Sequence, residues 1–385
     1  MTSTYKKFAV AAASAVLSLA AIEVNSAQAA SLYSVTDLGS LSGSTYSYAT
    51  GISNVGQVVF NAGIGSTNGS PLRGFLYSDG QLLEISPLPG DTDISVADIN
   101  NFGQVLANSA NDNNFTGVTP LIYSDGTAQS IDLNGIAYAI NDSGQVVGGT
   151  SGGGIFPELA FPFGAAFLYS NGTTTIVNTN LGENYVAYGL NNLSQVVGIF
   201  GSPGRAFLYD NGAITNLGTF PGDDYSTAFD INDLGQVVGH SSPNGIDDAT
   251  AFLYSSTAGM ISLGKLFPTD NYSSALGINN NGQIVGLSGT NPNFFTTTGE
   301  GFRAFLYSDG IMQDLNSLIA PDSGVILTQA ENINDRGEIV GAGSINGELH
   351  AVLLTPQQEV PEPASTMGVL LFSALGAGWQ LKRKL

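Results

Sequence analysis

Residues 231–239 read INDLGQVVG, and close copies of this stretch recur at 140–148, 278–286 and 333–341. Aligned on the central Gln, or on Glu in the last copy, seven copies span 281 residues, which is about 47 residues per unit. Their spacings vary from 41 to 55 residues, which indicates a repeated fold unit with loops of different lengths. The aligned positions are Gln57, Gln104, Gln145, Gln195, Gln236, Gln283 and Glu338.

Each unit contains four short apolar pieces that are rich in β-branched and aromatic residues. Examples are the stretches 228–231 (AFDI), 236–239 (QVVG), 251–254 (AFLY) and 214–218 (ITNLG). Such pieces are typical of β-strands, and no window between the two ends of the chain has a sustained apolar period of 3.6 residues. Every unit is therefore predicted to form four β-strands.

The residues between these pieces predict tight turns. Asn232 followed by Gly235 fits a type I turn between the first and second strands, with the Asn side chain bonding nearby backbone and Gly at positive φ. Asp309-Gly310 and its equivalents lie between the third and fourth strands, where both central residues of a type I′ turn need positive φ. Each unit is therefore a predicted antiparallel meander.

Seven four-stranded meanders with two apolar faces predict an all-β fold, a seven-bladed β-propeller over residues 30–356. The seventh unit ends after its third strand at residues 350–354, whereas residues 33–39 form a fourth strand without a unit. We therefore expect the N-terminal strand to complete the last blade and to remove the open sheet edges. An open β-solenoid and two smaller β domains are the alternative folds.

Both ends of the chain carry apolar segments. Lys6 and Lys7, an apolar run over 8–22, and Ala27-Gln28-Ala29 predict a signal peptide over 1–29 that signal peptidase cuts after Ala29. A linker over 357–364 precedes a predicted transmembrane helix and basic tail over 365–385. The 17 apolar residues 365–381 reach roughly 26 Å at about 1.5 Å per residue, enough to cross a bilayer. The basic residues that stop transfer are Lys382, Arg383 and Lys384.

The C-terminal tail resembles the PEP-CTERM sorting signal of bacteria that make an extracellular polymeric matrix. The likeness rests on Val360-Pro361-Glu362-Pro363, the single apolar span and the basic tip, about 26 residues in all. It implies that an exosortase-type protease in the membrane cuts near Pro361–Pro363. A plain C-terminal membrane anchor is the alternative.

The repeats resemble the bacterial extracellular HAF repeat over roughly residues 31–355, through AFLY, INxxGQVVG and DLGxL. Ser53, Ser194 and Glu338 depart from the pattern, and the His of the repeat's name is present only at His350. The resemblance implies an exported protein at the cell envelope or released outside the cell. It implies no particular chemistry.

Composition excludes several classes of protein. The chain has no cysteine, so no disulfide framework supports it. Without the two terminal segments it keeps five of its ten basic and 29 of its 31 acidic residues, a net charge of −24 that repels nucleic acid. No cofactor is predicted, although paired acids in loops could bind calcium. The acids of this possible metal site are Asp91, Asp93, Asp223, Asp224, Asp247 and Asp248.

No catalytic residues are predicted. The chain has two histidines, His240 and His350, and no thiol, so a His-based triad is disfavoured and a Cys nucleophile is excluded. The loops between the second and third strands vary from 6 to 16 residues and share one rim, which we call the loop rim. Variable loops on a rigid scaffold commonly bind ligands.

The sequence thus predicts a non-enzymatic binding or structural module whose partner is a matrix polysaccharide or a surface protein. Two alternatives remain open. One is a carbohydrate-active enzyme that uses rim carboxylates, because two acids about 5–10 Å apart are sufficient for glycoside hydrolysis. The other is a surface component stiffened by calcium.

Overall fold

The computed structural model describes residues 32–39, 44–63, 72–111, 117–150, 164–177, 185–245, 248–290 and 301–357. The chain divides into two units, 1–30 and 31–385, and all described residues belong to the second. The predicted signal peptide, sorting motif, transmembrane helix and basic tail lie outside the described residues. Within the described residues, no helix is long and apolar enough to span a membrane.

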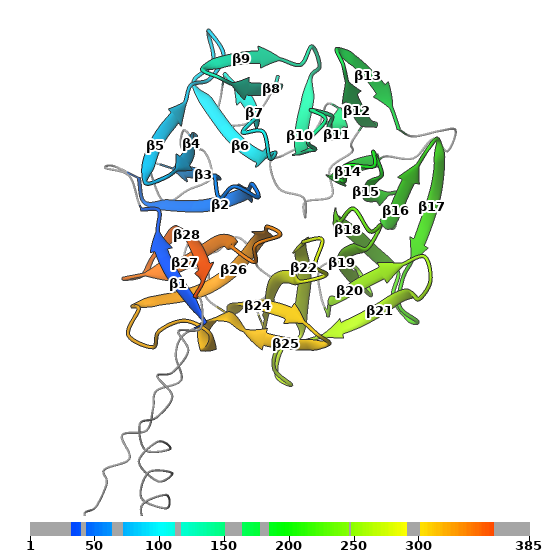
Figure 1. Ribbon diagram of the computed structural model, residues 1–385. Helices are drawn as coiled ribbons and strands as arrows, with labels where there is room; N and C mark the ends of the chain where they lie inside the picture. The colour runs from blue at the N-terminus through cyan, green and yellow to red at the C-terminus, as the bar shows by residue number, and fades with distance from the viewer. Residues whose placement is uncertain are drawn as a thin grey trace, which may run out of the picture. The chain divides into compact units, whose positions relative to one another are not determined.

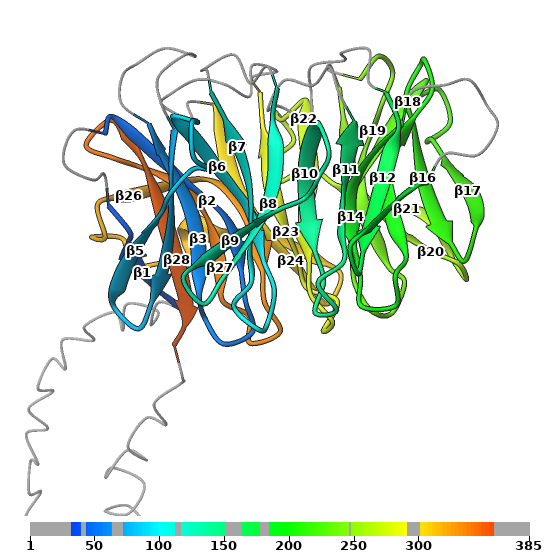
Figure 2. The ribbon, with the colours of Figure 1, turned by 90° about the horizontal axis from the view of Figure 1, so that it is seen from above.

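The described part is all-β, with 28 strands and one short 3₁₀ helix, η1 (Leu315–Ser317). Its repeated element is a four-stranded antiparallel meander in chain order. Figure 1 shows these sheets arranged around a common centre, with the first strand of each sheet innermost and the fourth outermost. Figure 2 shows the same sheets from the side. This arrangement is a β-propeller, as the sequence predicts.

Five sheets are complete meanders from consecutive strands. The second to fourth repeats supply β6 (Asp93–Ile99), β7 (Val105–Ala110), β8 (Thr119–Ser124), β9 (Thr127–Ser130), β10 (Gly135–Ile140), β11 (Val146–Thr150), β12 (Ala166–Ser170), β13 (Thr173–Ile176), β14 (Tyr185–Leu190), β15 (Val196–Phe200), β16 (Arg205–Asp210) and β17 (Ala213–Gly218). The fifth and sixth supply β18 (Tyr225–Ile231), β19 (Val237–Ser242), β20 (Thr250–Ser255), β21 (Gly259–Gly264), β22 (Tyr272–Ile278), β23 (Ile284–Gly289), β24 (Phe302–Ser308) and β25 (Ile311–Asp314).

The first and last repeats are joined by a single parallel bridge between Tyr46 and Leu349. Their strands are β2 (Tyr46–Ile52), β3 (Val58–Gly63), β4 (Leu72–Ser78), β5 (Gln81–Ile85), β26 (Val325–Ile333), β27 (Ile339–Ile345) and β28 (Glu348–Pro356). The N-terminal strand β1 (Tyr33–Asp37) pairs antiparallel with β28 over five residue pairs, from Tyr33↔Pro356 to Asp37↔Val352. The sheet of the last repeat therefore contains strands from both ends of the described chain.

The turns have the predicted backbone. Gly235, in the turn between β18 and β19, has φ +71°, and Ser194, which replaces this Gly in the fourth repeat, also has a positive φ of 63°. In the turn between β24 and β25, Asp309 and Gly310 have φ +54° and +81°, as a type I′ turn requires. One boundary differs from the prediction: the QVVG strand begins at the first Val, because the Gln belongs to the turn.

Each sheet contributes to two cores, because alternate side chains of a strand point to opposite faces. On β16, Phe207 packs with Ala187 and Val196 in one cluster, whereas Ala206 packs with Ala228 and Val237 in the next. The two apolar faces predicted for each meander are thus confirmed for this sheet. The sheets are held together by apolar contacts on both faces.

Candidate functional site

A cavity of about 140 Å³ lies where the turns between first and second strands meet, and we call this side of the propeller the turn rim. Every repeat lines it with the apolar end of its inner strand and polar residues of the following turn. The lining residues are Ile52, Asn54, Ile99, Asn100, Asn101, Ile140, Asn141, Asp142, Leu190, Asn191, Asn192, Ile231, Asn232, Asp233, Ile278, Asn279, Asn280, Ile333, Asn334 and Asp335. The repeated stretch therefore builds one shared polar pocket.

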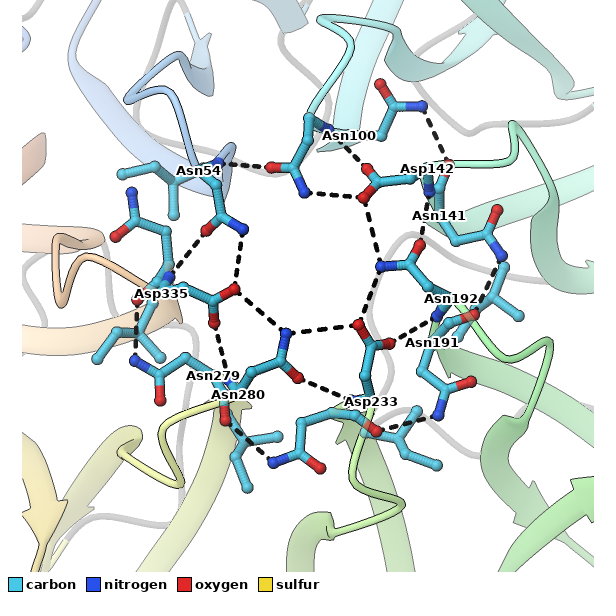
Figure 3. A pocket seen from close by; sticks show the side chains of 18 of the residues that line it. Asn54, Asn100, Asn141, Asp142, Asn191, Asn192, Asp233, Asn279, Asn280 and Asp335 are labelled. Atoms are coloured by element: carbon cyan, nitrogen blue, oxygen red, sulfur yellow. Dashed lines mark hydrogen bonds between the residues drawn. The ribbon is translucent and has the colours of Figure 1, made fainter.

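The second turn residue of each repeat forms what we call the Asn/Asp ring. Its members are Asn54, Asn101, Asp142, Asn192, Asp233, Asn280 and Asp335. Each backbone N–H donates to the side-chain oxygen of the next member, at distances of 2.6–2.9 Å. The last of these bonds runs from Asp335 N to Asn54 Oδ1, 281 positions apart in the chain. Figure 3 shows the ring with its bonds.

Each of the three carboxylates of the ring accepts three hydrogen bonds. Asp233 accepts the Asn192 N–H at 2.8 Å on Oδ1, and the amides of Asn192 and Asn280 at 3.1 and 3.4 Å on Oδ2. Asp142 and Asp335 accept the equivalent three bonds. Seven members cannot alternate strictly between acid and amide, and the alternation breaks once, between Asn54 and Asn101. The ring stabilises its own negative charge with its own amides.

The first turn residue is a buried Asn in six repeats and Ser53 in the first. In the fifth repeat, Asn232 Oδ1 accepts the N–H groups of Leu234 and Gln236 at 3.1 and 3.0 Å. Its Nδ2 donates to Gln236 Oε1 at 2.8 Å and to the carbonyl of Asn279, in the next repeat, at 3.0 Å. The same bond to the next repeat extends from Asn100 through Asn334, whose amide donates to the Ser53 carbonyl at 3.0 Å. The Asn of INDLG therefore ties neighbouring repeats together.

Acidic side chains also lie on the inner strands, between neighbouring repeats. Asp98 on β6 accepts the N–H of Ile99 at 2.8 Å and that of Ile140, in the next repeat, at 3.0 Å. Asp230 on β18 bonds Ile231 and Ile278 in the same way. Burial raises the pKa of Asp98 to about 7 and the pKa of Asp230 to about 6. Burial also raises the pKa of Glu331, on β26, to about 7.

Glu331→Gln is expected to stabilise the protein at alkaline pH. A carboxyl whose pKa is raised in the folded state favours folding when protonated, and this contribution is lost as the pH rises from about 4.5 through 7. The substitution should raise the free energy of unfolding at pH 8 by about 1–2 kcal/mol and much less at pH 5. Urea denaturation at both pH values measures the difference.

Glu84→Gln serves as the control for this substitution. The pKa of exposed Glu84 is lowered by its hydrogen bond to Arg73, the opposite direction, so its loss should give no gain at pH 8. An equal change in the free energy of unfolding of Glu331→Gln at pH 5 and pH 8 would contradict a raised pKa of Glu331 in the folded protein.

The acids predicted as a possible metal site are mostly engaged elsewhere. Asp91 and Asp223 accept hydroxyl bonds from Ser109 and Ser241 at 2.6 and 2.7 Å. Buried Asp93 accepts bonds from Leu72 N and Thr92 Oγ1, and Asp224 is exposed, with Arg205 at 3.9 Å. Asp248 has a positive φ in an exposed loop, and Asp247 lies outside the described residues.

Calcium binding at these acids stays a prediction. In the described part of the chain, no group of three or more His, Cys, Asp or Glu side chains could hold a metal ion. Asp91 and Asp223 instead fix the loops that lead into the inner strands. The backbone N–H groups of Leu88 and Phe220 donate to the same two serines at 2.9 and 3.1 Å.

The two histidines have different surroundings and different hydrogen-bond partners. His240 is buried, with its Nδ1 at 3.0 Å from Ser274 Oγ and aromatic rings around it, and burial lowers its pKa to about 4. His350 Nδ1 lies 3.0 Å from Asp37 Oδ1, which joins β28 to β1. One histidine thus has a hydroxyl partner and the other a carboxylate, so the described residues do not assemble a Ser-His-Asp triad around either.

Sequence reasoning missed the inter-repeat bonds of the turn. It interpreted the turn Asn as a local backbone partner and placed the binding side on the loop rim, whose loops lie largely outside the described residues. The available signal was the second turn residue, which is Asn or Asp in all seven copies although a type I turn does not demand this.

Residues 214–355 match a family described as "Protein of unknown function (DUF3466)", well under half of the chain. No curated protein matches the sequence. Among solved structures, one from a structural and mechanistic analysis of two prolyl endopeptidases gives a TM-score of 0.53 at 10% identity, covering 82% of this chain and 51% of that one.

Acylaminoacyl peptidase of Pyrococcus horikoshii gives a TM-score of 0.51 at 12% identity, over 86% of this chain and 54% of that one. Oligogalacturonate lyase in complex with manganese gives a TM-score of 0.51 at 12% identity, covering 86% of this chain and 95% of that one. The chain thus spans about half the length of the two peptidase structures. At these identities the likeness concerns the fold alone, and it agrees with the radial sheets of Figure 1: the chain has a β-propeller fold.

Proposed function

We propose that this protein is an exported, seven-bladed β-propeller that acts as a non-enzymatic binding or structural module at the cell surface or in the extracellular matrix. In this proposal, signal peptidase removes residues 1–29. Residues 365–381 hold the protein in the membrane until an exosortase-type protease cuts at 360–363.

Closure of the last blade by β1 is supported by a serine bond that recurs between repeats. Ser226 donates to the Gly218 carbonyl at 2.6 Å and accepts the Ala206 N–H at 2.9 Å, which ties β18 to the two outer strands of the preceding repeat. Ser47 makes the same pair of bonds to Gly39, just after β1, and to Ala351 of β28, at 2.9 and 2.8 Å. The junction of the two described chain ends thus carries the same pair of serine bonds as the junctions before the fifth and sixth repeats.

The non-enzymatic role is supported mainly by the use of the repeated polar residues. In the turn rim pocket, the ring carboxylates and the turn amides bond each other and the neighbouring backbone, which supports a structural use of these groups. Side chains that hydrogen-bond neighbouring repeats to each other make the scaffold rigid. The variable loops of the loop rim are then the segments free to select a partner.

Binding to matrix polymers tests this proposal. The full-length protein in mild detergent should be retained on columns of immobilised exopolysaccharide, or it should bind surface proteins in a glycan and protein array. A variant whose loop 151–163 is replaced by a short Gly-Ser linker should keep its melting temperature and lose at least tenfold in affinity. Release of reducing sugar from the same polymers, abolished in Asp224→Asn, would overturn the non-enzymatic assignment.

A further inference from the structure

The tips of the turns on the turn rim carry unusually exposed apolar side chains. Phe102, Leu234, Leu193 and Val55 are 76%, 70%, 62% and 59% exposed, and they are four of the five most exposed large apolar residues in the described part of the chain. Turn tips ordinarily carry polar residues, as Ser143 does in the third repeat. Exposure of this kind, gathered on one face, marks an interaction surface.

These four tips surround the mouth of the central pocket. Each follows directly in sequence a member of the Asn/Asp ring that lines the pocket. The tips of the sixth and seventh turns are Asn281 and Arg336, so the apolar sector covers the first, second, fourth and fifth repeats. Four of the seven turn tips around the polar centre are therefore apolar.

Both ends of the described chain leave from this rim. A Cβ on Gly337, in the seventh turn, would lie 3.5 Å from Pro356 Cγ. Gln357 N donates to the Leu32 carbonyl at 2.8 Å, which places the two ends side by side. In Figure 2, the arrow of β28 points to the edge of the propeller on which the tight turns lie.

We propose that the turn rim faces the membrane and that Val55, Phe102, Leu193 and Leu234 enter the headgroup layer of an electrically neutral bilayer. This inference rests on the proposed function, in which residues 365–381 anchor the chain. The linker 357–364 has eight residues and spans at most about 29 Å when fully extended, so the anchor holds this rim close to the lipid. Phe and Leu side chains on such a face partition into the headgroup boundary.

The charge of the rim selects among lipids. Asp142, Asp233 and Asp335 place three carboxylates inside the ring of tips. Anionic headgroups repel this centre, whereas zwitterionic headgroups do not. The bilayer that fits this face is therefore zwitterionic.

Depth-dependent fluorescence quenching tests the inference. The chain has no cysteine, so Leu234→Cys and Asn111→Cys each accept a single environment-sensitive label, on the turn rim and on the loop rim respectively. The full chain is reconstituted into phosphatidylcholine vesicles with brominated acyl chains. The label at 234 should be quenched at least threefold more than the label at 111, and phosphatidylglycerol should reduce this difference.

A second label separates the tips from simple tethering. A label on Val55→Cys should lose about half of its quenching when Leu193→Ser and Leu234→Ser, which copy Ser143, are added. Unchanged melting temperatures confirm that these variants fold.

Each other outcome is decisive. Failure of the full chain to float with vesicles overturns the anchor of the proposed function and this inference with it. Flotation with equal quenching of both labels overturns only this inference. Energy transfer between labelled chains at position 234 shows that a second copy covers the rim, which also overturns it.

Discussion

Deletion of residues 31–39 is expected to lower the free energy of unfolding by about 5 kcal/mol or more. The deletion removes β1, which pairs with β28 over five positions, and with it the buried side chains of Tyr33 and of Leu38, the residue after β1. Burial of each large side chain contributes about 2 kcal/mol, and each ladder hydrogen bond about 1 kcal/mol. Loss of β1 also exposes an unpaired edge of β28, which should cause aggregation. Urea denaturation and size-exclusion chromatography measure both effects.

Removal of residues 1–30 alone is the control for this deletion and should leave stability unchanged. A peptide of residues 31–39, added to the deleted protein, should restore part of the stability by adding a strand to the free edge. If the deletion of 31–39 left the denaturation midpoint unaltered, β1 would not belong to the last blade, and the proposed closure would be wrong.

Asn232→Ala is expected to cost about 3–4 kcal/mol of unfolding free energy. The Asn232 side chain is buried and makes four hydrogen bonds, one of which reaches the Asn279 carbonyl in the next repeat. Alanine leaves two N–H groups and a carbonyl without these partners, and each unsatisfied buried group costs about 1–3 kcal/mol. Equilibrium denaturation of the variant and the wild type measures the loss.

The first repeat supplies a natural comparison for Asn232→Ala. Ser53 occupies the equivalent position and accepts the Gln57 N–H at 3.1 Å. Asn232→Ser should therefore destabilise by an intermediate amount. Leu234→Ala, in the same turn, changes an exposed side chain and should stay within about 0.5 kcal/mol of the wild type. Equal losses for Asn232→Ala and Leu234→Ala would exclude a role for the inter-repeat bond.

The local structure could be predicted from the sequence because each repeat contains the residues that its tight turns require. Asp309-Gly310 requires positive φ at both positions, and few other residues tolerate this conformation. The alternating pattern of AFLY follows from the two-residue period of a strand, so it also predicted that each sheet packs on both faces. The last repeat has only three strands of its own, and the N-terminal strand β1 belongs to no repeat, so the sequence also predicted that β1 completes the last sheet.

The candidate site was less accessible, because its bonds join residues that are 41–55 positions apart, or 281 at the junction of the first and last repeats. A single repeat does not reveal that the Asn232 amide reaches the Asn279 carbonyl, since this depends on the angle between neighbouring sheets. The raised pKa of Asp98 likewise arises from burial between two repeats. The sequence shows the acid and not its surroundings.

The amino-acid sequence by itself determined the strands, the tight turns and the two-faced packing of each repeat, because these follow from backbone preferences and alternation within about ten residues. Only the tertiary structure decided that the same turns meet around one pocket, that Asn54 and Asp335 become neighbours, and that both described ends leave beside the seventh turn. Those relations depend on how successive sheets are rotated about the common centre, a geometry that no single repeat contains.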